Sequence, residues 1–503
     1  MTLTQQQLES SLWGAANALR GPVDPADFKN YVFPVLFWKW LSDTHDYNHE
    51  LAVEEWGDDL TDEIEADFQP FIIPPEEHWN VVARSTQAQK GLRVRRAMDT
   101  IAQANPDTLR GVFGDAAFAN EDRVPRPALD SLLNAFDKLT LNPKEVTGDM
   151  LGAAYEYLLE KFADSSGQKA GEFFTPRSVV HMLVDILDPQ PGESVYDPAC
   201  GSGGMLVETV TAISAKGGNP RAVSLHGQEV NLTTSAIARM NLFLHGIEDH
   251  DIVRGDTLRN PAHRTAAGTL RTFDKVIANP PFSLQDWGAD TWSGDKFGRA
   301  FCGVPPAKNG DYAWVQHMIT SLKPTGRAAV VLPHGVLFRG GKEAEIRKCI
   351  LDKDQVEAVI GLAPNLFYAT TIPVCILVLR KSKPDERKRK VLFIDASNRF
   401  QSGKNRNDLD ESDVKAIHAA YHEGKDIDGE DGLSLRMVEL SEIKANGYDL
   451  NIGRYVSSAV AVDETTVEES LAAWNTAREA REQAETALLA RLDEAGFGGG
   501  DDA

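Results

Sequence analysis

The chain has 503 residues, enough for about three domains of ordinary size. Its composition, 42% hydrophobic and 25% charged, is typical of a globular protein rather than a disordered one. The formal net charge of −23 argues against strong non-specific binding to nucleic acid by this chain alone. DNA can still be a substrate if a partner protein binds it.

Membrane, secreted and zinc-ribbon proteins are excluded by sequence features. The longest strongly apolar stretch, Ile372 to Leu379, is far shorter than the ~20 residues that cross a bilayer. The opening residues, MTLTQQQLESS, lack the pattern of a secretory signal. The cysteines lie far apart without a C-x-x-C pair, so we expect neither a disulfide framework nor a metal, and a reducing cytoplasm. They are Cys200, Cys302, Cys349 and Cys375.

The acidic charge is concentrated in two segments. Residues 41–79 contain thirteen acids and no lysine or arginine, and residues 461–503 contain eleven acids against three bases. The remainder is close to neutral and can hold a basic face. We therefore expect segment 41–79 to face away from phosphate or to contact a protein partner. Candidates for the basic face are Arg93, Arg95, Arg96 and the run from Arg380 to Lys390.

Residues 1–165 are predicted to form an all-helical N-terminal domain. Apolar residues recur at helical spacing between Leu8 and Leu19, and a strongly apolar second helix is predicted from Phe28 to Leu41. Prolines at 74–75 and at 125 and 127 indicate loops. No stretch in this region alternates like a strand.

From about residue 190, short apolar runs alternate with helix-like segments. This texture predicts an α/β fold for residues 166–400, a Rossmann-like, doubly wound and mostly parallel sheet. The expected strands are 194–197, 222–225, 251–253, 274–278, 327–332, 356–360 and 373–379.

The chain beyond residue 400 is predicted to be peripheral. Residues 401–460 are polar and are expected to be a loop-rich connecting region. Residues 461–503 are expected to be a C-terminal helix with an acidic tail, since 463–495 contain no internal proline or glycine. This helix either folds back on its own body or is an arm for docking a partner.

A glycine-rich turn follows the first predicted strand. It reads DPACGSGGML from Asp197 to Leu206, and its glycines allow a tight turn and a close approach to a ligand. Strand, turn and helix in this order suit NAD, a flavin or S-adenosylmethionine. The spacing is not G-x-G-x-x-G and no Lys-Ser/Thr follows, so a nucleoside without a phosphate chain is favoured.

Acids at the ends of the next two strands extend this pocket. Glu229 lies where a carboxylate would hold a ribose diol, and Asp256 lies where one would accept a hydrogen bond from an adenine amino group. Either acid alone is typical of an ordinary loop. In succession after a glycine-rich turn, the two predict a nucleoside site.

The fourth predicted strand leads into the tetrapeptide Asn279-Pro280-Pro281-Phe282. Two prolines make the backbone stiff and hold the asparagine at the carboxyl end of a strand. This suits methylation of an amide or exocyclic nitrogen: the asparagine oxygen and the Pro280 carbonyl would accept the N–H groups, and Phe282 would stack on the planar group. Preorganised acceptors would stabilise the developing positive charge.

In this order, the segments resemble the modification (M) subunits of type I restriction–modification systems, which are N6-adenine DNA methyltransferases. The stretch GEFFTPR from Gly171 to Arg177 is similar to the family segment that wraps the methionine end of the cofactor. Asp197 to Leu206 resembles the family's cofactor loop, and Asn279 to Phe282 its catalytic tetrapeptide. Further similar stretches are Leu12–Ala16 with Leu19–Gly21, Gly326–Arg339, Asn365–Tyr368 and Tyr448–Tyr455.

The resemblance implies the cofactor S-adenosyl-L-methionine. Among the cofactor contacts given below, Asp256 is assigned by its position at the end of the third predicted strand. It also implies double-stranded DNA as substrate, a separate specificity (S) subunit that reads the sequence, a second copy of this chain in a core of two M subunits and one S subunit, and a restriction (R) subunit. Because a duplex hides the adenine amino group, the base must flip out of the stack. The implied cofactor contacts are Glu172, Phe173, Phe174, Thr175, Pro176, Arg177, Asp197, Gly201, Ser202, Gly203, Gly204, Glu229 and Asp256.

Other functions are less well supported. Methylation of a protein glutamine amide also uses Asn-Pro-Pro, but GEFFTP and the flanking helical regions favour DNA. A catalytically silent assembly subunit would not need the glycine turn with Glu229 and Asn279. An NAD dehydrogenase would need a pyrophosphate clamp that is not evident. Lys323 and His334 lie near the fifth predicted strand and could be taken for catalytic groups. We interpret His334 as a loop residue that shapes the site.

Overall fold

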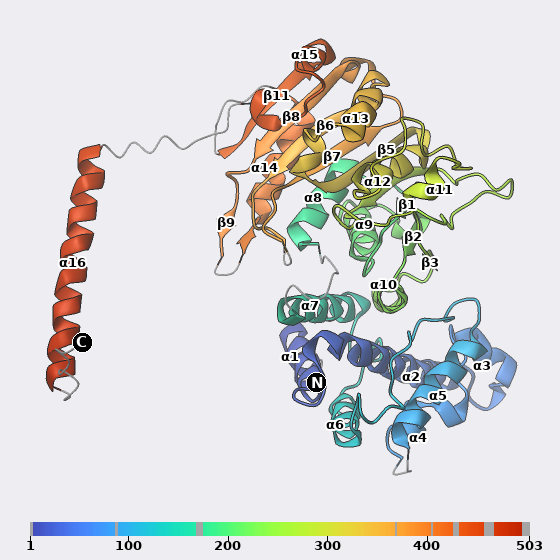
Figure 1. Cartoon of the computed structure of the whole chain (residues 1–503). Coiled ribbons are helices and arrows are strands. Elements are labelled where there is room, and N and C mark those ends of the chain that lie inside the picture. Colours follow the sequence, from blue (N-terminus) through green and yellow to red (C-terminus); the bar gives the residue numbers. More distant parts are fainter. Residues whose placement is uncertain are drawn as a thin grey trace. The chain divides into compact units, whose positions relative to one another are not determined.

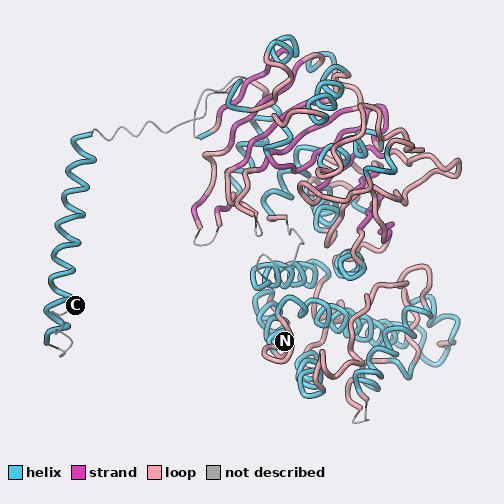
Figure 2. Tube along the Cα trace, viewed as in Figure 1, coloured by secondary structure: helices cyan, strands magenta, loops and turns pink. Residues whose placement is uncertain are grey.

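The computed structural model describes residues 4–85, 89–166, 175–367, 370–403, 406–425, 432–456 and 467–494. Residues 1–458 form one compact unit, and residues 459–503 form a second (Figures 1 and 2). Among the described residues, no helix is long and apolar enough to cross a membrane.

The N-terminal part of the first unit is helical, as predicted. Its second helix is longer than expected, and Pro34 lies inside it. A hydrophobic core runs from Leu8 to Phe162 and holds the helices together. The helices are α1 (Gln5–Asn17), α2 (Phe28–Trp56), α3 (Asp62–Phe68), α4 (Trp79–Val82), α5 (Lys90–Ala104), α6 (Arg126–Phe136) and α7 (Gly148–Ser166).

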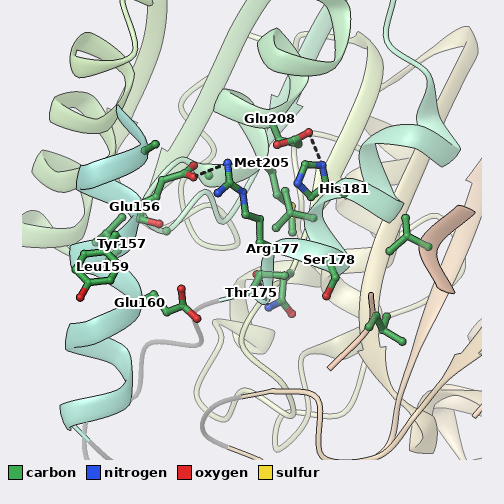
Figure 3. Close-up of a pocket in the computed structure, with 18 of the residues that line it drawn as sticks. Glu156, Tyr157, Leu159, Glu160, Thr175, Arg177, Ser178, His181, Met205 and Glu208 are labelled. Atoms are coloured by element: carbon green, nitrogen blue, oxygen red, sulfur yellow. Dashed lines mark hydrogen bonds and ion pairs between the residues drawn. The ribbon is translucent and has the colours of Figure 1, made fainter. Parts of the chain in front are cut away.

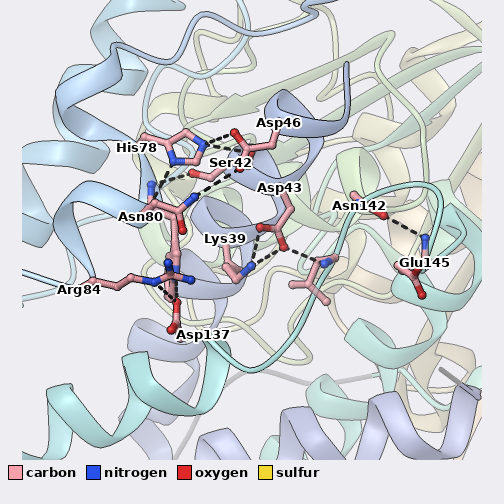
Figure 4. Close-up of polar contacts among 12 residues, drawn as sticks. Lys39, Ser42, Asp43, Asp46, His78, Asn80, Arg84, Asp137, Asn142 and Glu145 are labelled. Atoms are coloured by element: carbon pink, nitrogen blue, oxygen red, sulfur yellow. Dashed lines mark hydrogen bonds and ion pairs between the residues drawn. The ribbon is translucent and has the colours of Figure 1, made fainter. Parts of the chain in front are cut away.

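Part of the acidic segment 41–79 is used inside this helical part (Figure 4). Asp43 pairs with Lys39 one helical turn earlier and accepts the backbone N–H of Leu141 at 2.7 Å. The Asp46 carboxylate lies 3.1 Å from His78 Nε2. These acids therefore stabilise the fold, whereas others of the segment are exposed.

The remaining part of the first unit is built on a nine-stranded sheet. The strand order is β11-β8-β6-β7-β5-β4-β1-β2-β3, and β7 and β11 run antiparallel to their neighbours. This confirms the predicted mostly parallel, doubly wound sheet. The strands are β1 (Ser194–Asp197), β2 (Ser224–Glu229), β3 (His250–Arg254), β4 (Phe273–Ala278), β5 (Leu322–Pro333), β6 (Val356–Leu362), β7 (Val374–Arg380), β8 (Lys390–Ala396) and β11 (Ser434–Glu439).

Helices cover both faces of the sheet because successive strand residues alternate between two cores. In β4, Val276 and Ala278 join one core while Ile277 joins the other. One face is covered by α8, α9 and α14, and the other by α12 and α13. The helices of this part are α8 (Arg177–Leu187), α9 (Gly204–Ala215), α10 (Leu232–Leu244), α11 (Ala289–Trp292), α12 (Asp311–Thr320), α13 (Lys342–Asp352), α14 (Glu411–Glu423) and α15 (Leu440–Ala445).

Helix α10 joins the helical part to the sheet. Ala236, Ile237 and Phe243 on one side belong to the N-terminal core, whereas Ala238 packs in a core of the sheet. The buried Tyr155 of α7 also donates its hydroxyl to the Ile237 carbonyl at 3.0 Å. The two parts are thereby packed as one unit.

The expectation of a loop-rich connection over 401–460 is wrong for most of that segment. Strand β11 extends the sheet by pairing with β8, and α14 packs against α8. The signal was present, since Val414, Ile417, Ala420 and Tyr421 recur at helical spacing and are buried. The polar residues between them lie on the solvent side of the helix, and they made the helical pattern hard to recognise in the sequence. A short hairpin of β9 (Gln401–Ser402) and β10 (Asn407–Asp408) precedes α14.

The expectation of unpaired cysteines is wrong for one pair. Cys302 and Cys349 form a disulfide, with their Cα atoms 5.6 Å apart. They are 47 positions apart in sequence, and packing of the loop before α12 against α13 brings them together. Cys200 and Cys375 are buried thiols.

The second unit contains α16 (Val467–Glu494). The helix begins and ends close to the predicted limits, 463 and 495. Whether it folds back or docks a partner stays a prediction, as do the four domain boundaries.

Candidate active site

Strands β1 and β4 are parallel neighbours at the centre of the sheet. Tyr196 of β1 pairs with Val276 of β4, so the glycine turn after Asp197 and the tetrapeptide after Ala278 leave the sheet at the same edge. Strand β2 lies on the far side of β1, so the chain winds in opposite directions from this point. In such sheets ligands bind in the crevice at the carboxyl ends of the strands.

The glycine turn has the backbone that its sequence predicts. Gly201 and Gly203 have positive φ angles of 53° and 80°, which residues with a Cβ rarely adopt. A Cβ on Gly203 would also lie 3.4 Å from Ala238 of α10. The N–H of Gly201 donates to Glu229 Oε2 at 3.1 Å, which connects the turn to the end of β2.

Two cavities of about 940 and 490 Å³ lie at this edge and share part of their lining. Each volume falls within the range of roughly 300–1,000 Å³ that is usual for cofactor and small-molecule sites. The shared lining residues are Leu159, Ala199, Gly201, Ser202 and Asn279. The larger cavity is also lined by Thr175, Arg177, Asp197 and Gly204, and the smaller by Glu229, Asp256, Pro281 and Trp314.

Most of the predicted site residues are therefore brought together. Four of them line neither cavity: Pro176, Gly203, Pro280 and Phe282. Pro176 precedes α8, Gly203 packs toward α10, and the Phe282 ring makes an edge contact with Phe367, 6.4 Å between centroids. Glu172, Phe173 and Phe174 lie outside the described residues.

The side chain of Asn279 has a defined orientation. Its Nδ2 donates to Thr175 Oγ1 at 2.9 Å. Its Oδ1 is buried and has no hydrogen-bond partner among the described residues. A buried amide oxygen without a donor costs free energy, so this atom is ready to accept a hydrogen bond from a ligand.

The backbone after Asn279 is anchored from α12. Ser283, at a positive φ of 50°, donates its N–H to Asp311 Oδ1 at 2.7 Å. Asp311 is fully buried and pairs with Arg339, which also pairs with Glu343 at 2.6 Å. We did not predict Asp311, because nothing in the sequence marks this acid as buried.

Carboxyl groups line both cavities and differ in their hydrogen-bond partners. Asp197 accepts the Ala199 N–H at 3.0 Å, and burial raises the pKa of its carboxyl to about 8. Glu229 Oε1 accepts the Asn231 N–H at 2.8 Å. Asp256 accepts the Arg259 N–H at 3.0 Å and lies 3.4 Å from the same residue's guanidinium. Asp256 is thus already engaged within its own turn.

Helix α7 brings the helical part of the unit to the larger cavity (Figure 3). Arg177 of α8 lies 3.3 Å from Glu156 of α7, an ion pair across the cavity wall. Deeper in, His181 lies 2.7 Å from Glu208, and this hydrogen bond raises the pKa of His181. Neither α7 nor Glu208 was predicted to be part of the site.

Two further polar side chains of the site were also missed. Asn241 of α10 is fully buried and donates to the Ser202 carbonyl at 3.0 Å, which holds the glycine turn from behind. Trp314 of α12 lines the smaller cavity, and its buried Nε1 has no partner among the described residues. Both belong to helices whose sequence only indicates apolar packing.

His334 and Lys323 are engaged in structural contacts. His334 Nε2 donates to the Val374 carbonyl at 3.0 Å, and burial lowers its pKa. Lys323 pairs with Asp274 at 2.6 Å, at the opposite end of β4 from Asn279. Neither residue lines the two cavities.

Known proteins are similar to this chain in both sequence and fold. The model of the N-6 DNA methylase family matches residues 146–464, and that of the HsdM N-terminal domain matches residues 8–139. The chain belongs to the N-6 DNA methylases of type I restriction enzymes.

The individual proteins that this chain resembles are methylase subunits of type I restriction enzymes. The HindI methylase subunit of Haemophilus influenzae is 37% identical over 72% of this chain and 77% of its own length. The MpnII methylase subunit of Mycoplasma pneumoniae is 30% identical over 92% of this chain and 91% of its own. The methyltransferase subunit of a type I restriction–modification system of Streptococcus thermophilus has a TM-score of 0.79 at 30% identity, over 90% of this chain and all of that one.

As an N-6 DNA methylase, the chain transfers a methyl group from S-adenosyl-L-methionine to the N6 amino group of adenine in DNA. The site fits this cofactor. The glycine turn leaves room for a close approach, the Glu229 carboxylate lines the smaller cavity at the end of β2, and Asn279 Oδ1 is an acceptor with no partner among the described residues, facing the side where the substrate amine would lie.

Proposed function

We propose that Asn279 Oδ1 and the Pro280 carbonyl accept the two N–H groups of the target amine. The amine lone pair is otherwise delocalised into the ring, and two acceptors localise it on nitrogen. The bound cofactor supplies an electrophilic methyl group on a sulfonium. The acceptors stabilise the positive charge that develops on the amine, and no strong base is required. The buried Oδ1 of Asn279, which has no hydrogen-bond partner in the part of the chain that the structure describes, is the observation that carries this proposal.

Thr175 positions this acceptor. The threonine hydroxyl receives the Nδ2 hydrogen at 2.9 Å and holds the amide with Oδ1 left to accept. The Asp311–Ser283 hydrogen bond of 2.7 Å holds the backbone that follows. We assign Phe282 to stacking on the flipped base and Phe367 to supporting its ring from the side.

The cofactor-binding residues are assigned to the two cavities. Glu229 would hold the ribose diol and Asp256 the adenine amino group, since both line the smaller cavity. Thr175, Arg177 and Asp197 would surround the methionine end, since they line the larger one. The turn residues Gly201, Ser202, Gly203 and Gly204 give the backbone its close approach, and Glu172, Phe173, Phe174 and Pro176 belong to the same assignment by resemblance.

We further propose that the chain works in an assembly in the cytoplasm. Its net charge of −23 does not suit independent binding to a polyanion, so a specificity subunit would read and grip the DNA. Two copies of this chain would flank that single subunit to form the modification core, and a restriction subunit would join for cleavage. Flipping the adenine costs a few kcal/mol of stacking, which clamping of the duplex would offset.

Transfer of labelled methyl groups to DNA, with and without the specificity subunit, tests this proposal. Digestion to nucleosides should give N6-methyladenine. Asn279→Ala should lower the transfer rate at least ~100-fold, as expected for loss of a preorganised acceptor, while calorimetry shows nearly unchanged cofactor binding. A variant that keeps its rate, or a product methylated on cytosine N4, would contradict the assignment.

A further inference from the structure

Three titratable side chains converge at the opposite end of β2 from Glu229. His226 of β2 and His263 of the β3–β4 loop are buried, and each has its Nδ1 at 3.4 Å from Asp251 Oδ2 at the start of β3. The Asp251 side chain is 52% exposed. None of the three lines either cavity of the methylase site.

The other ring nitrogens already have partners. His263 Nε2 lies 3.0 Å from the Gly227 carbonyl, which can only accept, so Nε2 carries a hydrogen. In the neutral ring, Nδ1 then presents a lone pair to the Asp251 carboxylate. His226 Nε2 lies 2.8 Å from Ser224 Oγ, and its Nδ1 points to the same carboxylate oxygen. In the neutral state the His263 Nδ1 lone pair therefore faces the Asp251 carboxylate oxygen, an arrangement that a cation or an added proton would stabilise, and His226 Nδ1 reaches the same oxygen at 3.4 Å.

The spacing of these atoms matches a metal site better than hydrogen bonds. Both nitrogen–oxygen distances of 3.4 Å exceed the usual N–H···O range. Ligands around a tetrahedral ion with bonds of about 2.0–2.1 Å lie about 3.3–3.4 Å apart. The three ligand atoms of the cluster all lie within 4.8 Å of one another.

We propose that His226, Asp251 and His263 bind one divalent transition-metal ion of the zinc class. Two imidazole nitrogens favour such an ion over magnesium or calcium, which prefer oxygen ligands. The exposed side of Asp251 gives the ion a route from solvent and leaves the fourth position for water.

The ion would connect the strands that carry the cofactor acids. His226 lies three residues before Glu229 on β2. The β3–β4 loop is already tied to β2, because Gln228 donates to the Asn260 carbonyl at 3.1 Å and accepts the Ala262 N–H at 2.9 Å. A metal at His263 would brace this loop at a further point, so its role is structural.

A second cluster of similar composition serves as a control. His45, Asp46 and His78 also lie within reach of one another. His45 Nδ1 is buried and has no hydrogen-bond partner among the described residues. The His78 ring, however, is satisfied, since Nδ1 accepts the Asn80 N–H at 3.3 Å and Nε2 contacts the Ser42 carbonyl and Asp46 at 3.2 and 3.1 Å, so this cluster offers an ion fewer free ligand atoms. We expect no ion at this cluster.

The test uses the full chain, purified without a polyhistidine tag and stripped with EDTA. It is titrated with Zn²⁺ by calorimetry and with Co²⁺ by visible absorption, and compared with Asp251→Asn, His263→Gln and the matched control Asp46→Asn. Circular dichroism and S-adenosylmethionine binding check that each variant is folded. Asp251→Asn is the variant that best preserves the fold, because the Asp251 side chain is half-exposed and Asn keeps its shape.

We expect one Zn²⁺ per chain and the strong absorption of tetrahedral Co²⁺. Asp251→Asn and His263→Gln should raise the dissociation constant at least tenfold and remove the absorption, whereas Asp46→Asn should change neither. The proposal is overturned if the wild-type chain shows no saturable binding, if folded Asp251→Asn binds as tightly as wild type, or if Asp46→Asn loses the ion.

Discussion

At the scale of single residues, the orientation of one amide governs the proposed chemistry. An asparagine can present either its oxygen or its NH₂ group to a cavity, and only the oxygen activates an amine. In the structure the hydroxyl of Thr175 accepts the Nδ2 hydrogen of Asn279, so Oδ1 is the atom left for a ligand. The two residues are 104 positions apart in sequence and meet only in the folded chain.

Thr175→Val should therefore slow methyl transfer by roughly fivefold, the equivalent of about 1 kcal/mol for one hydrogen bond. Valine keeps the shape of threonine but leaves the amide orientation unsecured. Single-turnover transfer at saturating cofactor measures the effect, and a separate titration checks cofactor affinity. Thr175→Ser retains the hydroxyl and should transfer at close to the wild-type rate; equal rates for Val and Ser would contradict this role.

The buried carboxyl of Asp197 predicts a pH dependence of stability. Burial raises its pKa to about 8 from the ordinary value of 3.8, so the native state keeps a proton that the unfolded chain releases. The free energy of unfolding must then fall as pH rises between about 4 and 8, and level off above. Asp197→Asn removes this dependence, because the amide oxygen can still accept the Ala199 N–H.

Melting temperatures of Asp197→Asn and wild type, measured side by side across that window, provide the test. The difference should grow in favour of the variant as pH rises toward 8. Other titrating groups affect both proteins equally and cancel in the comparison. A constant difference across the window would show that Asp197 is ionised in the native state.

At the scale of elements, α10 supports the cofactor turn. Ala238 packs against Gly203, and Asn241 donates to the Ser202 carbonyl at 3.0 Å. The same helix contributes Ile237 and Phe243 to the N-terminal core. The helical part of the chain and the cofactor turn therefore share one supporting element.

Gly203→Ala should weaken S-adenosylmethionine binding by roughly fivefold. Its φ of 80° costs alanine about 1 kcal/mol, so the turn relaxes when empty and binding must restore it. Calorimetry measures the loss. Gly217→Ala is the matched control, since its φ of 76° carries similar strain at the end of α9, away from both cavities. It should lower stability but not affinity; equal affinity loss in the two variants would contradict the explanation.

At the scale of the whole molecule, the chain consists of a catalytic unit and a separate C-terminal helix. The three large hydrophobic cores lie entirely within residues 8–456. Deleting residues 459–503 should therefore shift the melting temperature by only a few degrees and leave cofactor binding intact, because no core residue is removed. Thermal unfolding and calorimetry of the shortened chain check this outcome.

Assembly of the shortened chain then decides between the two interpretations of α16. If the helix docks a partner, size-exclusion chromatography should show loss of the complex with the specificity subunit while the isolated chain stays folded. If the helix folds back on its own body, assembly should persist.

Features that depend on local backbone chemistry could be predicted from the amino-acid sequence alone. Glycines at 201 and 203 predicted a tight turn, the two prolines after Asn279 a stiff corner, and the alternation of short apolar runs a parallel sheet. These signals lie within a few residues of one another, so they can be read without knowing the fold.

Contacts between residues far apart in the sequence depend on how the chain packs. The Cys302–Cys349 disulfide, the Thr175–Asn279 hydrogen bond and the pairing of β11 with β8 all join segments far apart in sequence. Burial, too, raises the pKa of the Asp197 carboxyl. Packing creates these contacts and this desolvation, and neither leaves a periodic trace along the chain.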